Sequence, residues 1–186
     1  MFKLAFTVSL QPTEFSSAVY LENFNKVCEK LSSLGYHGVE LAICDSSQVD
    51  TIRINESISK HRLKIPAIGT GQGYIRDGLS LCHPGSKIRQ RAKERLIDHI
   101  DFASHFKSNI IIGLIRGHIE ENLNAKKCVS WAVDIVRQCC QYAKGKSVKI
   151  FLEPINRYEI NFINTLEEGH RFIEQVTEDN LLLLID

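Results

Sequence analysis

The chain has 186 residues, of which 44% are hydrophobic and 24% are charged, and its formal net charge is +1. This is the composition of an ordinary globular protein, which excludes disordered, fibrous and coiled-coil chains. A charge so close to zero provides no overall field to attract nucleic acid or an anionic membrane, and no apolar run approaches the ~20 residues that span a bilayer. We therefore expect a single domain over residues 1–186, with neither a nucleic-acid nor a membrane partner.

Short apolar runs rich in β-branched residues alternate with longer stretches whose apolar residues recur three and four positions apart. The short runs predict strands at 4–10, 38–43, 65–69, 109–115, 148–153 and 181–186. The longer stretches predict helices at 15–34, 49–61, 86–106, 122–143 and 165–176. Such alternation is typical of βα units around a parallel sheet. A closed barrel of this kind needs eight strands and typically ~250 residues, so we expect an incomplete (β/α) TIM barrel of about six units, with its C-terminal part missing.

Several helix ends can be predicted from single residues. Ser86 is expected to be the N-cap of the helix that follows it, and Thr165 with Glu168 fits a capping box at the start of the last helix. Gly35 and Gly145 stand where helices should end in the left-handed conformation.

Two acids stand at the ends of apolar strands. Glu153 follows an apolar run that begins at Val148, and Asp186 follows a run of leucines that begins at Leu181. The two acids are one strand–helix–strand unit apart, so parallel neighbouring strands would bring both to the same mouth of the barrel. Strand ends of this kind supply the metal ligands and the acid/base groups of TIM-barrel enzymes.

Three further charged residues are candidates for the same mouth. Glu159 should lie in the loop over the mouth, where it would hold a substrate hydroxyl or form a surface salt bridge. Glu40 lies within an apolar strand and must either face a polar barrel interior or pair with a basic residue, because an isolated buried charge is costly. Arg116 follows a strand and would bind an anionic group at the mouth or pair with a neighbouring carboxylate.

Gly69 is the first residue of the glycine-rich stretch 69–73, and such a stretch could indicate a nucleotide-binding loop. The next helix is expected only at about residue 86, so no helix N-terminus would be in place for a pyrophosphate. We expect Gly69 to form a wall that a small substrate can approach closely.

The six cysteines include no C-x-x-C pair and no cluster with histidines. This arrangement favours reduced thiols in a cytoplasmic protein over a disulfide framework.

Three stretches resemble the xylose isomerase-like TIM-barrel superfamily of sugar phosphate isomerases and epimerases: 34–41, 110–117, and 153–159 with its continuation at 184–186. The third stretch is similar to the E-P-x-N-R-[FY]-E segment of the ketose 3-epimerase and hydroxypyruvate isomerase branch. The resemblance implies that Glu153 is a metal ligand and an acid/base, that Glu159 holds a substrate hydroxyl beside the reacting carbon, and that Asp186 is the next metal ligand.

The implied activity is isomerisation or epimerisation of a ketose or a sugar phosphate, through an enediolate formed by proton transfer next to a carbonyl. The implied cofactor is a divalent ion, Mn²⁺ or Mg²⁺ before Zn²⁺ or Co²⁺. The resemblance also implies a metal-binding histidine on strand seven and a catalytic glutamate on strand eight, both beyond residue 186. We therefore expect the chain alone to bind metal weakly, to be inactive, and to self-associate as a homo-oligomer through its open sheet edge.

Two other interpretations compete with the sugar epimerase. An inactive truncated barrel or binding module would also lack half of the ligands. A DNA repair enzyme similar to endonuclease IV shares the barrel, but it needs a histidine-rich zinc site, and the strand that ends at Gly69 is not followed by a histidine.

Overall fold

The computed structural model describes residues 2–13, 19–20 and 23–186. Strands and helices alternate along these residues, as the apolar periodicity predicts. In chain order the elements are β1 (Ala5–Ser9), β2 (Val19–Tyr20), α1 (Phe24–Ser33), β3 (Gly38–Ala42), η1 (Ser46–Gln48), α2 (Thr51–Lys60), β4 (Ala67–Gly69), α3 (Gln72–Asp77), α4 (Ser86–His105), β5 (Asn109–Ile112), η2 (Leu114–Arg116), α5 (Ala125–Lys144), β6 (Ile150–Leu152), α6 (Leu166–Val176) and β7 (Leu181–Leu183).

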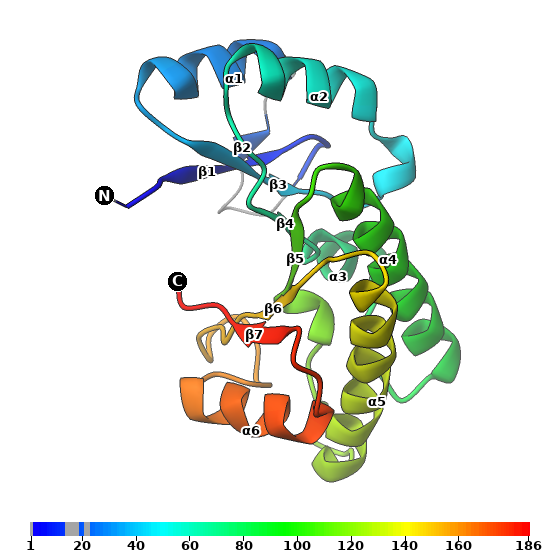
Figure 1. Ribbon diagram of the computed structural model, residues 1–186. Coiled ribbons are helices and arrows are strands. Elements are labelled where there is room, and N and C mark those ends of the chain that lie inside the picture. The colour runs from blue at the N-terminus through cyan, green and yellow to red at the C-terminus, as the bar shows by residue number, and fades with distance from the viewer. Residues whose placement is uncertain (1, 14–18, 21–22) are drawn as a thin grey trace.

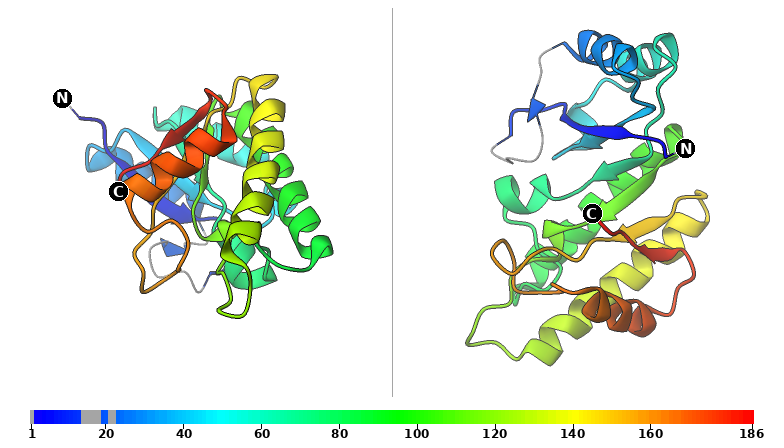
Figure 2. Two further views of the ribbon diagram at one scale, coloured as in Figure 1. Left: turned by 90° about the horizontal axis from the view of Figure 1, so that it is seen from below. Right: turned by 90° about the vertical axis from the view of Figure 1, so that its left-hand side faces the viewer.

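The strands form one parallel sheet in the order β2-β1-β3-β4-β5-β6-β7. The sheet curves, with α1 and α2 at one end, α4 and α5 along its back and α6 at the other end (Figure 1). Within the described residues β7 pairs with β6 alone, so the sheet does not close on itself. The two chain ends lie on the side of the sheet away from α4 and α5 (Figures 1 and 2). The predicted fold class, an incomplete (β/α) barrel, is confirmed.

The main core lies between the sheet and the helices on its convex side. Val39 and Leu41 of β3 are fully buried there, while Glu40 between them points to the concave side because side chains alternate along a strand. The predicted stripe of α4 is also buried, with Ala92 and Leu96 both at 0% exposure. Burial of each Leu or Ile side chain contributes about 1.5–3 kcal/mol, so this layer holds the helices onto the sheet.

Two predicted elements are wrong in part. The helix expected over 15–34 begins only at Phe24, and residues 19–20 form β2 against β1; residues 15–18 and 21–22 of that expectation lie outside the described residues. The region between Gly69 and Ser86 was expected to contain no helix, yet α3 begins at Gln72. Its six residues are too few to show an apolar period, which is why the sequence pattern did not predict it.

Two of the predicted helix ends are confirmed and two are wrong. The capping box of Thr165 and Glu168 is present, and Gly35 has the left-handed φ of +84°. Gly145 was predicted to be left-handed and is not, because its φ is −63° and the chain turns at Ser147 with φ 58° instead. Ser86 was predicted to be the N-cap and is the first helical residue; the N-cap is Gly85, which has no side chain to donate or accept.

All six cysteines are buried and unpaired, as expected of reduced thiols. In the part of the chain that the structure describes, none of the helices has the length and apolar character needed to cross a membrane.

Candidate active site

A cavity of about 480 Å³ opens at the carboxyl ends of the strands, inside the curve of the sheet. Four acids of the described residues line it: Glu40, Glu153, Glu159 and Asp186. We call these four residues the cavity acids. Over the residues that the structure describes, no lysine, arginine or histidine lines this cavity. The structure therefore brings Glu153 and Asp186, which the sequence pattern places at neighbouring strand ends, into one cavity with two further acids and with no basic side chain from the described residues.

Small residues on the concave face of the sheet make room for this cavity. Ala42 of β3 is paired with Gly69 of β4, and both line it. A Cβ atom added to Gly69 would meet no atom closer than 3.9 Å, because the space beyond it is open. This agrees with the expectation that Gly69 forms a wall that a small substrate can approach, although its role in substrate binding stays a prediction.

Glu153 lies one residue beyond β6. Its backbone N–H donates to the carbonyl of Ile112 at 3.1 Å, which continues the β5–β6 ladder to the mouth. Its carboxylate lies beside Gly113, where an added Cβ would be only 2.9 Å from Oε2. Glycine at position 113 is therefore required for the carboxylate to occupy this place. Burial, and then the negative charges of Asp186 and Glu40, raise the pKa of Glu153 to about 7.

Asp186 and Glu40 complete this group. The N–H of Leu184 donates to the carbonyl of Leu152 at 2.9 Å, so the chain beyond β7 still follows β6 and carries Asp186 to the cavity. Glu40 accepts a hydrogen bond from the hydroxyl of Thr7 at 3.3 Å. It forms no ion pair with any described residue, so the first of its two predicted roles, facing a polar interior, is the one observed. Burial, with a smaller contribution from the charge of Asp186, raises its pKa.

Glu159 lies in the segment 154–164, which we call the mouth loop. Its Oε1 accepts a hydrogen bond from Nδ2 of Asn156 at 2.5 Å, and the side-chain oxygen of Asn156 accepts from the N–H of Tyr158 at 3.0 Å. The role of Asn156 was not predicted, although this residue stands three positions before Glu159 in the same motif. Glu159 is exposed and lines the cavity from the mouth loop, as predicted.

Arg116 does not lie at the mouth, where its position after a strand predicted it. The side chain is 1% exposed and does not line the cavity, so it is not available to an anionic group at the mouth. It also forms no ion pair among the described residues; its guanidinium donates instead to the backbone carbonyls of Gly113, Glu153, Phe162 and Ile163. The prediction failed because a position just after β5 does not reveal that the mouth loop, which follows β6, will cover the side chain.

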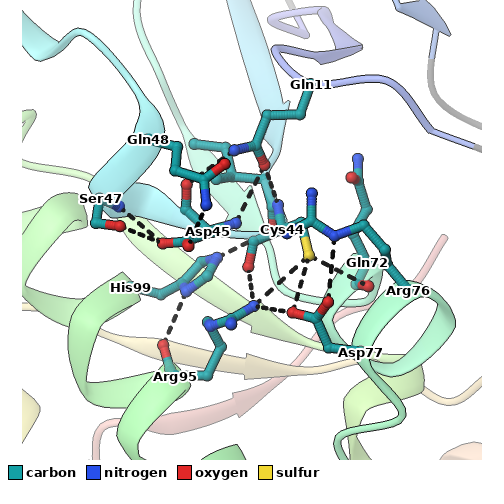
Figure 3. Close-up of polar contacts among 11 residues, drawn as sticks. Gln11, Cys44, Asp45, Ser47, Gln48, Gln72, Arg76, Asp77, Arg95 and His99 are labelled. Carbon is teal, nitrogen blue, oxygen red and sulfur yellow. Dashed lines mark hydrogen bonds and ion pairs between the residues drawn. The ribbon is translucent and has the colours of Figure 1, made fainter.

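A second polar cluster, which the sequence pattern did not predict, is drawn in Figure 3. It lies beside the cavity, because its member Gln72 also lines the cavity. We call it the Cys44 network; its main members are Gln11, Cys44, Asp45, Gln72, Asp77, Arg95 and His99. The side-chain oxygen of Gln11 accepts from the N–H groups of Cys44 at 2.8 Å and Asp45 at 3.1 Å. These contacts tie the segment after β1 to the segment after β3.

The centre of the Cys44 network is the ion pair between Arg95 of α4 and Asp77 of α3, at 2.9 Å. Arg95 also donates to the carbonyl of Cys44, and the Cys44 thiol donates to Asp77 at 3.4 Å. Burial and the neighbouring charge of Asp77 raise the pKa of the Cys44 thiol, so it is held in the unreactive neutral form. Hydrogen bonds thus occupy the principal polar groups of this cluster, which indicates a structural role.

A family model described as "Xylose isomerase-like TIM barrel" matches residues 28–186. A D-psicose 3-epimerase of Ruminiclostridium cellulolyticum is 29% identical over 167 residues, which are 85% of this chain and 55% of that protein. An L-ribulose 3-epimerase of a Methylomonas species is 25% identical over 154 residues, which are 82% of this chain and 52% of that protein.

Among solved structures, a D-psicose 3-epimerase with D-tagatose from Clostridium cellulolyticum H10 superposes with a TM-score of 0.76 at 22% identity. It is matched over 98% of this chain and 62% of its own. The chain thus spans about half the length of the curated relatives it matches.

Proposed function

The chain belongs to the xylose isomerase-like TIM barrel family, and from this membership we propose that it is part of a metal-dependent ketose epimerase. In this proposal a proton is removed from and returned to a carbon next to a carbonyl, through an enediolate. The relatives named above, a D-psicose and an L-ribulose 3-epimerase, support this reaction class. The observation that carries the proposal is the set of four cavity acids without a basic neighbour in the cavity wall.

The donor chemistry of the cavity fits a hard divalent cation. Carboxylate oxygens suit Mn²⁺ and Mg²⁺, and Glu153 and Asp186 would hold the ion. Among the described residues no group of three His, Cys, Asp or Glu side chains could hold a metal, so in this proposal Glu153 and Asp186 supply only part of the ligand set. When bound, such an ion polarises the carbonyl and adjacent hydroxyl of a sugar as a Lewis acid.

Glu153 would act as the general base and acid. A carboxyl with a pKa near 7 is well matched to proton transfer at neutral pH, since it is neither a very weak base nor permanently ionised. Glu159 would accept a hydrogen bond from a hydroxyl of the sugar, held in place by Asn156. Epimerisation also needs an acid on the opposite face of the carbon, and the family resemblance implies that this group follows residue 186.

The charge of the cavity favours an unphosphorylated ketose over a sugar phosphate. A phosphate placed among four carboxylates would be repelled, and no described residue of the cavity wall is a cation that would offset the repulsion. The same argument disfavours a DNA repair activity, because a phosphodiester is also an anion. An inactive barrel remains the expected behaviour of the 186-residue chain on its own.

Metal binding can be tested on this chain directly. We expect Mn²⁺, followed by electron paramagnetic resonance, to bind with a Kd on the order of 10⁻⁴–10⁻³ M, the weak end of the range for carboxylate sites. Glu153→Gln and Asp186→Asn should each weaken it about tenfold. Glu167→Gln is the matched control, since Glu167 pairs with Arg171 on the surface of α6. Equal Mn²⁺ affinity in all four chains would reject the metal site.

The reaction itself is tested on a full-length barrel. Deuterium from D₂O should enter C3 of a ketohexose or ketopentose faster than C3 of the corresponding phosphate. Glu153→Gln should lower the rate by ~10²–10⁴-fold, the usual cost of losing a positioned acid or base. Deuterium exchange that survives this substitution would overturn the role of Glu153.

A further inference from the structure

Arg116 is a cation buried at the junction of three backbone segments. It donates to the carbonyl of Gly113 at 2.7 Å at the end of β5, and to the carbonyl of Glu153 at 2.9 Å at the end of β6. Its other donors reach the far end of the mouth loop, at the carbonyl of Phe162 and at that of Ile163, the latter at 2.8 Å. One side chain thus joins two strand ends to the loop that folds over them.

Burying this charge is costly, and none of the described acids forms an ion pair with the side chain. An apolar residue of similar size would fill the same space without that cost, so packing alone does not explain an arginine here. A lysine ammonium has three donors on one atom, whereas the planar guanidinium spreads five donors over three nitrogens. That geometry suits four carbonyls that belong to different segments.

The segments joined by Arg116 are those that carry two of the cavity acids. Glu153 contributes one of the four carbonyls, and Glu159 lies in the mouth loop that Arg116 holds at its far end. Several contacts of the mouth loop are internal: Asn164 donates to the carbonyls of Ile155 and Ile160, and Ile155 donates to that of Ile163. Asn161 attaches the loop to the backbone of Ile119 by two hydrogen bonds, and Arg116 attaches it to the ends of β5 and β6.

We propose that Arg116 is a positioning residue, which sets the place of Glu159 relative to Glu153 by fixing the mouth loop to the ends of β5 and β6. The consequence for sugar binding rests on the proposed function; the attachment of the loop does not. Burial lowers the pKa of Arg116 to about 10, so the side chain stays a cation at neutral pH and keeps its donors.

Hydrogen–deuterium exchange on the 186-residue chain tests the attachment without metal or sugar. Arg116→Met should speed exchange at the amides of Ile155, Glu159 and Ile160 at least tenfold, because the loop is released. Arg95→Met is the matched control: it removes the same group from the Cys44 network, so it should speed exchange at Cys44 and Asp45 and leave the mouth loop unchanged. Unchanged loop exchange in Arg116→Met would overturn the proposal.

Arg116→Lys serves if the methionine variant does not fold. A lysine keeps the charge but reaches fewer of the four carbonyls, so loop exchange should rise by a smaller factor; exchange equal to that of the unmodified chain would overturn the proposal.

A full-length barrel distinguishes positioning from a general loss of stability. Both Arg→Met variants should lower the melting temperature, but only Arg116→Met should raise KM for the ketose severalfold beyond any change in kcat, because Glu159 contacts the sugar. An equal rise of KM in Arg95→Met would overturn the proposal. Faster loop exchange in Arg116→Met, with no turnover by the unmodified barrel, would support the attachment and reject the proposed function instead.

Discussion

The Cys44 network and the cavity acids lie side by side at the mouth, and they accommodate charge in different ways. In the network, Asp77 accepts from Arg95 and Arg76, and Asp45 accepts from Ser47 and Gln48. In the cavity, Glu153 and Asp186 have no ion-pair partner among the described residues, and each faces other acids. Both clusters combine acids with polar neighbours, so composition alone does not distinguish them.

The pKa values follow this difference in surroundings. Burial alone would raise the pKa of Asp77, but the hydrogen bonds from Arg95 and Arg76 outweigh it and lower the pKa. Glu153 has no comparable donors, so burial and neighbouring acids raise its pKa. The network therefore stabilises the fold, whereas the cavity keeps its acids in an unfavourable state that a bound cation would relieve. A cluster of buried acids without compensating charges is costly to stability, and such clusters are found at functional sites.

The largest expected effect is the loss of the central ion pair of the network. Asp77→Asn removes the partner of Arg95, whose side chain is only 15% exposed, and leaves that charge without compensation. We expect the free energy of unfolding to fall by about 2–3 kcal/mol in urea titrations. The double variant Asp77→Asn with Arg95→Met should recover part of the loss, because no uncompensated charge remains. A loss below about 0.5 kcal/mol would show that the network contributes little.

The stability that Glu153 of the cavity contributes should change with pH in the opposite direction from the stability that Asp77 of the network contributes. The pKa of Glu153 is about 7 in the folded chain against 4.5 for the free side chain, so the folded state binds more protons between these values. Stability should therefore fall as pH rises from about 4.5 to 7, by on the order of 1–2 kcal/mol after solvent screening. The lowered pKa of Asp77 acts below this window, where stability is lost as pH falls.

Urea titrations across pH measure this dependence, and Glu153→Gln is the critical variant. It should flatten the slope between pH 4.5 and 7 and make the chain more stable than the unmodified one at pH 8. Glu167→Gln, which alters an exposed acid, should leave the slope as it is. An identical slope in both variants would contradict the raised pKa.

A smaller effect is expected on Mn²⁺ affinity, which should differ between alanine substitutions at two glycines of the cavity. In Gly113→Ala the new Cβ would lie 2.9 Å from Oε2 of Glu153, so the carboxylate must move and Mn²⁺ binding should weaken about three- to tenfold. In Gly69→Ala the new Cβ meets no atom closer than 3.9 Å, so Mn²⁺ binding should not change. Calorimetric titration of both variants is the measurement. Equal affinities would show that the carboxylate adjusts without cost, or that it does not bind the ion.

The weakest expected effect concerns the edge of the sheet at β7. This strand pairs with β6 alone in the described residues, and Leu182 and Ile185 are exposed at 38% and 73%. Unpaired strand edges promote association, so sedimentation should show concentration-dependent self-association. Ile185→Lys should reduce it, whereas Ile52→Lys, at an equally exposed site on α2, should not. A strictly monomeric chain at high concentration would contradict this prediction.

The amino-acid sequence by itself determined the alternation of strands and helices, because apolar periodicity is a local property that each segment shows on its own. It also determined that Glu153 and Asp186 share one mouth, since both follow apolar runs and parallel strands end on the same side. The capping box at Thr165 could also be predicted because it is local: its partner Glu168 is three residues away.

Only the tertiary structure decided the features that depend on distant segments. Arg116 looked like an anion-binding residue until the mouth loop, which returns some 46 residues later in the chain, was seen to cover it. Glu40 had two possible surroundings, and the partner Thr7 that accompanies it on the concave face comes from another strand. The Cys44 network joins four separate segments, and a pKa depends on every charge nearby in space. Contacts of this kind leave no periodic signal in the sequence, because the residues that make them are neighbours only after folding.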